Sequence, residues 1–309
     1  MKKKTLLVLL FFSCCICVFA QNPSNRVTSI LQIMDIKTGK ITVVKEFDYR
    51  VEAPNWTKDG KSLIYNSNGS IYKIPIEGGE SVRIETGSVN ECNNDHVISP
   101  DGSMLAVSGS TEELSGSRIF LLPFEGGEPT LIVEKSLSYL HGWSPDGSTF
   151  CYCGERDGNY DVYTISVNGG EEKRLTTPEV LDDGPEYSPN GKYIWFCSVR
   201  TGLMQIWRML PDGSDQRQIT FDEDYNHWFP HVSPNGKWVV CLAYHKGDIE
   251  PGEHLSYKNV VLRMMTTKGR KLRTIHSLFG GQGTFNVNSW APDSRHFAFV
   301  SYRFESESK

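Results

Sequence analysis

The sequence is poor in clustered positive charge. Lys and Arg number 32 against 37 Asp and Glu, so the formal net charge is −5 at neutral pH, and the densest basic run is Lys2-Lys3-Lys4 at the start of the chain. Nucleic-acid binding relies on clustered cations that neutralise phosphates. We therefore expect no nucleic-acid partner.

Cysteine is also scarce. Of the eight cysteines, three lie within residues 14–17 and only five follow: Cys92, Cys151, Cys153, Cys197 and Cys241. An odd number does not suggest a disulfide framework. Four of the five sit in apolar strand patterns, where a free cysteine behaves as a small hydrophobic residue. We predict buried, unpaired thiols.

Long apolar runs are absent after residue 20. The one apolar run, residues 6–19, is shorter than the roughly 20 residues that span a bilayer. It follows three lysines and ends in Val18-Phe19-Ala20, the layout of a secretory signal peptide. We predict a signal peptide over 1–20, cleavage near Ala20, and a periplasmic or secreted protein with no transmembrane helix. A lipoprotein is less favoured, because the residues before each leader cysteine make a poor lipobox.

The pentapeptide G-x-S-x-G does not occur, which argues against a serine hydrolase of the dipeptidyl-peptidase type. The glycine-rich stretch 280–283 is not followed by Lys-Ser or Lys-Thr, so it is a weak phosphate-loop signal.

A turn of the type W-S-P-D-G does occur, in six copies. They end at Gly60, Gly102, Gly147, Gly191, Gly236 and Ser294, with spacings of 42, 45, 44, 45 and 58 residues. Such a period is the length of one four-stranded propeller blade. Within a copy, Pro sets the first turn dihedral, Asp or Asn bonds the backbone ahead, and Gly supplies a positive φ.

The strands of the last blade come from both ends of the chain. After the sixth turn, only the strand pattern 296–302 remains, while residues 29–36 and 40–47 have the pattern of a third and a fourth strand without a preceding turn. Closing the ring in this way removes exposed strand edges. The sequence therefore predicts an all-β, six-bladed β-propeller over 21–309, whose last blade is closed by N-terminal strands.

The repeats resemble those of TolB-like propellers. The resemblance rests on Trp143-Ser144-Pro145-Asp146-Gly147, on Asp161-Val162-Tyr163-Thr164-Ile165 and on Arg174-Leu175-Thr176, and extends over nearly the whole mature chain. The runs 93–96, 200–209, 228–231 and 279–284 resemble a set of exported bacterial TolB-like proteins without an assigned biochemical role. TolB carries an additional α/β domain ahead of its propeller, and since none fits here we do not expect a Tol–Pal role.

Polar residues are expected to meet where the innermost strands enter the channel, the usual geometry of a ligand site. Aligning the copies places these candidate ligand-binding residues at or near the channel mouth: His96, His141, Asp183, His227, His231, Gln282 and Asn288. A second set recurs after the second strands: Arg156, Arg200, His245 and Arg303. Guanidinium groups match carboxylates bidentately, so these arginines suggest an anionic or polyhydroxylated ligand. Solvated loop charge or bracing between blades is an equal alternative.

A sharper hypothesis is a divalent-metal site drawn from His96, His141, His227, His231, Asp95 and Asp183, since imidazole and carboxylate ligate transition metals and manganese. His227 and His231 lie four extended steps apart, roughly 13 Å, and would share an ion only if the chain between them turns sharply. Oligogalacturonate lyases, a related propeller group, hold a metal with channel-mouth histidines and a glutamine. Gln282 is only a loose analogue of that glutamine, so we expect no cofactor, with a divalent metal as the alternative.

The long interval between the fifth and sixth turns places about thirteen extra residues in one loop, His245 to Lys258, which we interpret as a binding loop or a polar excursion. Taken together, the sequence predicts a monomeric binding module that takes a carbohydrate or a peptide or protein segment at the channel mouth. The alternative is a metal-dependent lyase or related enzyme acting on acidic carbohydrate at the same place.

Overall fold

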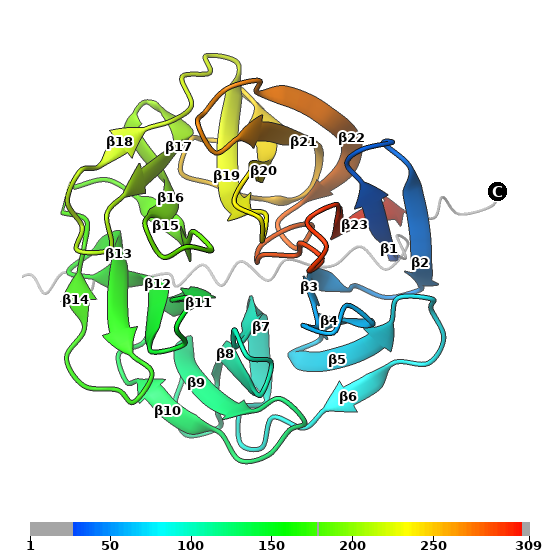
Figure 1. Cartoon of the computed structure of the whole chain (residues 1–309). Coiled ribbons are helices and arrows are strands. Elements are labelled where there is room, and N and C mark those ends of the chain that lie inside the picture. Colours follow the sequence, from blue (N-terminus) through cyan, green and yellow to red (C-terminus); the bar gives the residue numbers. More distant parts are fainter. Residues whose placement is uncertain (1–26, 178, 305–309) are drawn as a thin grey trace, which may run out of the picture.

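Six antiparallel sheets surround a central channel in the computed structural model, which describes residues 27–177 and 179–304 (Figure 1). The described residues are strands, turns and irregular segments, so the all-β prediction is confirmed. No helix in these ranges is long and apolar enough to cross a membrane. The predicted signal peptide 1–20 lies outside the described residues.

Five blades have four strands in sequence order from the channel outward. Blade 1 contains β3 (Glu52–Trp56), β4 (Ser62–Ser67), β5 (Ser70–Pro75) and β6 (Val82–Ile84). Blade 2 contains β7 (Glu91–Ile98), β8 (Met104–Ser110), β9 (Arg118–Pro123) and β10 (Thr130–Val133). Blade 3 contains β11 (Ser138–Trp143), β12 (Thr149–Arg156), β13 (Asn159–Ser166) and β14 (Lys173–Arg174). Blade 4 contains β15 (Asp182–Tyr187), β16 (Ile194–Thr201), β17 (Leu203–Met209) and β18 (Arg217–Gln218). Blade 5 contains β19 (Tyr225–Val232), β20 (Trp238–His245), β21 (Ser256–Thr266) and β22 (Arg273–Gly281).

The sixth blade is built from both ends of the chain, as predicted. β1 (Val27–Asp35) pairs on one side with β2 (Ile41–Phe47) and on the other with β23 (His296–Phe304). Arg295 reinforces the closure, because its guanidinium donates to both carboxylate oxygens of Asp35. The expected innermost strand is irregular: residues 282–292 contact β23 through the isolated bridge Trp290–Phe297 and through separate backbone hydrogen bonds, such as the one that Val300 donates to Thr284. A turn at Gly283, whose amide donates to Asn286 Oδ1, takes the place of a ladder there.

The six W-S-P-D-G-like turns have the predicted chemistry. In blade 3, Ser144 donates to Asp146 Oδ1, which also accepts the amide of Ser148, and Gly147 has a φ of 73°. The sixth copy carries Ser294 at the glycine position, and Ser294 also has a positive φ, 58°. We call these the anchor turns, and the side of the ring that carries them the anchor-turn face; the opposite side is the loop face.

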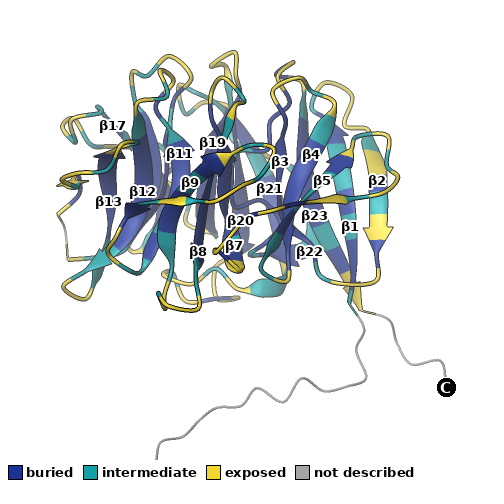
Figure 2. Cartoon of the chain, turned by 90° about the horizontal axis from the view of Figure 1, so that it is seen from below, coloured by how far each residue is buried: buried dark blue, intermediate teal, exposed yellow. Residues whose placement is uncertain are grey.

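The core lies between neighbouring blades, where apolar side chains of successive sheets interdigitate; Figure 2 shows the buried residues running through the strands and the exposed ones at the loops and outer edges. The five described cysteines are buried and unpaired, as predicted.

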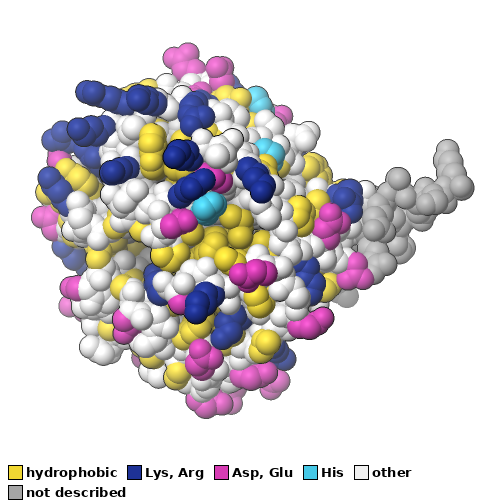
Figure 3. Space-filling view, turned by 45° about the vertical axis from the view of Figure 1, so that its right-hand side comes forward, with side chains coloured by type: hydrophobic (Ala, Val, Ile, Leu, Met, Phe, Trp, Pro, Cys, Tyr) yellow, Lys and Arg dark blue, Asp and Glu magenta, His cyan; other side chains and the backbone are white. Residues whose placement is uncertain are grey.

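Figure 3, which views the molecule obliquely from the anchor-turn face, shows Lys and Arg gathered in its upper part and Asp and Glu along its lower edge.

Candidate functional site

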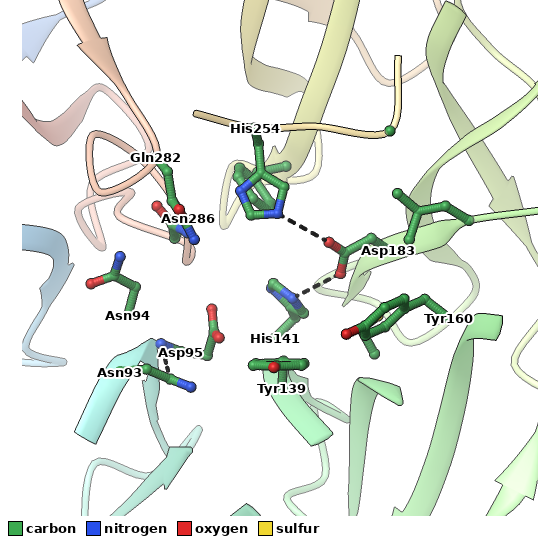
Figure 4. Close-up of a pocket in the computed structure, with 14 residues that line it drawn as sticks. Asn93, Asn94, Asp95, Tyr139, His141, Tyr160, Asp183, His254, Gln282 and Asn286 are labelled. Atoms are coloured by element: carbon green, nitrogen blue, oxygen red, sulfur yellow. Dashed lines mark hydrogen bonds and ion pairs between the residues drawn. The ribbon is translucent and has the colours of Figure 1, made fainter. Parts of the chain in front are cut away.

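A cavity of about 330 Å³ opens where the inner strands enter the channel from the loop face (Figure 4). Its lining combines side-chain amides, two carboxylates, two imidazoles and aromatic rings. The lining residues are Asn93, Asn94, Asp95, Tyr139, His141, Cys153, Tyr160, Leu181, Asp183, Phe229, Gly252, His254, Gln282 and Asn286.

Irregular pairing of the inner strands shapes this cavity. Each of the five inner ladders, from β3–β4 to β19–β20, shifts register partway along the inner strand. Such bulges bend a strand and re-aim its side chains. In blade 4 the shift coincides with Gly184 at a φ of 61°, a conformation in which its amide donates to Asp183 Oδ1 at 2.6 Å. In blade 5 it coincides with Phe229, a non-glycine residue at a φ of 54°.

His141 and Asp183 form the central pair of the site. His141 Nε2 lies 3.2 Å from Asp183 Oδ1, and both side chains are almost fully buried. Burial by itself would lower the pKa of His141, but the Asp183 carboxylate, together with Asp95, outweighs it and leaves that pKa raised. Burial likewise opposes ionisation of Asp183, yet His141 and His254 hold its pKa well below the usual range. Each member of the pair therefore favours the charged form of the other.

Asp95 is the second carboxylate of the cavity. Burial raises its pKa to about 7, and the nearby carboxylates Asp183 and Glu52 add to that rise, while His141 opposes it. Asp95 thus exchanges its proton near neutral pH and can present either a donor or an acceptor to a bound group. A cluster of titratable groups with perturbed pKa values in a recessed site is typical of a functional site.

His254 reaches the cavity from the long loop between β20 and β21. Its ring packs edge-on against Trp228 and Phe229, with ring centroids 4.5 and 5.4 Å away, and its Nε2 lies 3.9 Å from Asp183 Oδ2. Burial lowers the pKa of His254. Gly252 lines the same cavity, so this loop forms part of its wall. The sequence signal for this contribution was the loop's excess length, although His254 itself was not among the predicted site residues.

Two tyrosines complete the opposite wall. Tyr139 of β11 and Tyr160 of β13 lie with ring centroids 6.3 Å apart, and Tyr160 was not among the predicted residues. Tyr160 follows a two-residue turn of blade 3, and no sequence pattern there distinguishes it from an aromatic residue that packs within a strand.

The predicted arginines lie away from the cavity and are held by acids. Arg156 binds both carboxylate oxygens of Glu172, and Arg200 donates to Asp182 Oδ2 at 2.6 Å. Arg303, more than half exposed, pairs with Glu46 at 3.0 Å. The acids that they bind lie in the same blade as each arginine, so these ion pairs link strands within a blade and do not brace one blade against another.

The predicted channel residues divide into two groups. His141, Asp183 and Gln282 line the cavity. His231 and Asn288 instead bond Glu186 elsewhere on the channel wall. His96 and His227 are fully buried and make no well-aligned hydrogen bond among the described residues; burial, the largest cause, lowers their pKa values to about 4 and about 3. His245 is exposed and packs on Tyr225.

The fold and this recessed site define a β-propeller with a ligand-sized polar cavity at the mouth of its channel. A family model described as the TolB β-propeller domain matches residues 114–269, about half of the chain. A protein of Agrobacterium fabrum described as uncharacterized is 45% identical over 281 residues, which cover 91% of this chain and 94% of that protein. The chain belongs to the TolB-like β-propeller family.

Solved structures agree with this assignment. The structure of a candidate TolB from Agrobacterium tumefaciens is 45% identical, has a TM-score of 0.86, and is matched over 91% of this chain and 99% of that one. TolB from Acinetobacter baumannii, 21% identical with a TM-score of 0.65, shares the fold over 84% of this chain and 64% of its own length.

Proposed function

We propose that this chain is a binding module that takes a segment of a partner protein in the cavity at the loop face. The observation that carries the proposal is the lining: the amides of Gln282 and Asn286 and the Asp95 carboxyl surround a recess of ligand size, beside Asn93 and Asn94, whose amides also bond the scaffold. Such groups satisfy the donors and acceptors of a peptide backbone, while Phe229 and the two tyrosines offer apolar contact.

The charge of the cavity favours a neutral or cationic ligand. Asp183 and His141 compensate one another, Asp95 adds negative charge as the pH rises, and the arginines predicted to hold an anion bind acids of the scaffold instead. A neutral oligosaccharide has the same donors and acceptors as a peptide and is the second ligand class that we propose. An acidic sugar would face an uncompensated carboxylate.

A pair of selections tests this function. Random dodecapeptides displayed on phage, and separately a glycan array, are presented to the wild-type protein and to the double variant H254A/Y160A. Both substituted side chains line the cavity; Tyr160 also contacts Tyr139, and His254 packs against Trp228 and Phe229. We expect ligands that bind the wild type and lose most of their affinity for the variant, with matched thermal unfolding of the two proteins. Ligands that bind both proteins equally would refute the proposal.

The metal-dependent lyase stays a prediction from the sequence. Across residues 27–177 and 179–304, no group of three or more His, Cys, Asp or Glu is placed to hold a metal ion. His141 and Asp183 are directed at each other, so the donor set does not fit an open metal site. An oligogalacturonate lyase in complex with manganese is 14% identical with a TM-score of 0.53, a likeness of fold alone. Elemental analysis of the purified protein tests the prediction: metal well below one equivalent would overturn it.

We also propose that the module acts outside the cytoplasm, in the periplasm or after secretion. This rests on the leader pattern of residues 1–20. Mass spectrometry of the protein from an expressing Gram-negative host tests it, since cleavage near Ala20 would leave Gln21 at the N-terminus.

A further inference from the structure

A second recess lies on the opposite side of the ring, between the anchor turns of blades 4 and 5. It has a volume of about 530 Å³, and we call it the blade 4–5 groove. Its walls are the two turns at 188–192 and 234–236, and its other lining residues are Tyr193, Trp195, Arg208, Val232, Thr267 and Lys268. None of these residues lines the cavity at the loop face.

Three cations line this groove without a carboxylate partner. Lys192, Arg208 and Lys268 form no ion pair within 4.0 Å in the part of the chain that the structure describes. Arg156, Arg200 and Arg263, by contrast, each bind an acid. The positive charge of the groove is therefore uncompensated by the fold.

Arg208 is positioned as a rigid donor. Its guanidinium carbon lies 4.2 Å from the centroid of the Tyr193 ring and 5.7 Å from that of Trp195, and Nη1 donates to the carbonyl oxygen of Thr267 at 3.2 Å. Its Nε is buried and has no acceptor in the described residues. A guanidinium stacked in this way keeps its remaining donors pre-organised for a planar anion such as a carboxylate.

The same recess between blades 2 and 3 has a different chemistry, although the backbone positions correspond. There the turns carry Asp101 and Asp146 where the blade 4–5 groove has Asn190 and Asn235. Ser103 stands at the position of Lys192, and Met104 at the position of Tyr193. The strand pairing also matches, since Ala106 pairs with Leu121 as Trp195 pairs with Arg208. Because a recess between two anchor turns forms with either set of residues, the fold of this region does not require the cations.

We propose that the blade 4–5 groove binds an acidic segment of a partner protein, with a carboxylate held by Arg208 between the two lysines and an apolar side chain packed on Tyr193. The uncompensated positive charge of the groove favours an anionic ligand. The walls formed by the two turns fit an extended peptide chain better than a flat membrane surface. This site is distinct from the loop-face cavity and does not rest on the function proposed for it.

A converted groove provides the test. The variant N190D/K192S installs the residues of the blade 2 turn, and R208L installs the leucine of blade 2. The probe is a fluorescein-labelled hexaglutamate peptide, followed by fluorescence anisotropy at low ionic strength, where surface charge is least screened. We expect N190D/K192S to bind about fivefold more weakly than the wild type, and R208L at least as weakly. The matched control K61S changes the same turn position in blade 1 and should leave affinity unchanged.

Several outcomes would overturn the proposal. These are an absence of saturable hexaglutamate binding to the wild type, equal binding by N190D/K192S, or an equal loss in K61S. Hexaglutamine should not bind, and binding of hexaglutamine as tightly as hexaglutamate would refute the role of charge. Phosphatidylglycerol vesicles serve as the last probe: binding of vesicles but not of the peptide would assign the groove to an anionic membrane instead.

Discussion

Two histidine–carboxylate pairs contribute to the channel wall and differ in how fully they are bonded. In the inner pair, Glu186 Oε2 lies 2.7 Å from His231 Nδ1, while its Oε1 accepts from the amide of Val232 and from Asn288 Nδ2. His231 Nε2 in turn lies 3.2 Å from the carbonyl oxygen of Phe285. Both side chains have protein partners at each end.

The mouth pair, His141 and Asp183, is built from the same groups but faces a cavity. Among the residues that the structure describes, the ion-pair partner of Asp183 Oδ2 is the more distant His254 Nε2, at 3.9 Å, and Asp95 shares the space with a pKa near neutrality. A fully bonded buried pair cross-links the ring, whereas a pair with spare capacity beside a cavity can respond to a ligand. The contrast predicts that changes in the inner pair act on stability and changes at the mouth act on pH response and binding.

The largest effect should come from the inner pair. Glu186→Ala removes the acceptor of three contacts inside the ring and leaves the imidazole of His231 and the amide of Asn288 without their partner. We expect the free energy of unfolding to fall by about 3 kcal/mol, measured by urea denaturation. The exposed Glu80→Ala serves as the control. A loss of unfolding free energy equal to that of the control would contradict this prediction, because the inner pair would then not stabilise the ring.

The next effect should depend on pH. The pKa of Asp95 is raised from 3.8 to about 7, so between these values the folded protein holds a proton that the unfolded chain has lost, and this group lowers stability as the pH rises through that range. Asp95→Asn should therefore be more stable than the wild type at about pH 8, by about 2 kcal/mol, with the difference vanishing near pH 4.

Thermal unfolding at several pH values measures the Asp95 effect. The control, the exposed Asp157→Asn, should follow the wild type across the range. A constant offset between Asp95→Asn and the wild type would show that burial of the carboxyl does not raise its pKa.

A smaller effect should follow from Arg156. The sequence allowed this residue either a ligand-binding or a bracing role, and the structure shows it bound to Glu172. Arg156→Gln should lower the free energy of unfolding by about 1 kcal/mol, because Glu172 keeps Lys135 and Tyr152 as partners. Ligands selected at the loop face should bind this variant as they bind the wild type. Reduced ligand affinity without reduced stability would instead show that Arg156 takes part in ligand binding.

A distinct spectroscopic effect should come from Asp183→Asn. Without that carboxylate, burial dominates at His141 and its pKa should fall below the usual value. A pH titration of the ring signals by NMR measures this shift. The ring signals of His296, which pairs with Asp293 in the sixth anchor turn far from the cavity, are the internal control and should be unchanged by the substitution. An unchanged midpoint for His141 would mean that the pair is not coupled.

Much of the scaffold could be predicted from the sequence, because its causes are local. Pro, Asp or Asn, and Gly at fixed offsets determine the anchor turns, and their period determines the blade count. The pattern of residues 29–47 predicted the closure that β1, β2 and β23 form. His141 and Asp183, whose register in the repeat predicts a place at the channel mouth, line the cavity, as does Gln282, which no repeat register predicted.

The remaining features of the site depend on tertiary structure, because the position of a residue within the repeat does not determine its long-range contacts. Bulges in the inner strands re-aim side chains only once neighbouring blades are packed, so His96 and His141, at equivalent repeat positions, have different environments. Arg156 and Arg200 find their acids by packing between strands, and His254 enters the cavity because a long loop folds over the ring. The sequence alone determined the propeller ring and the depth along the channel at which the site lies. Long-range packing determined which side chains face the cavity.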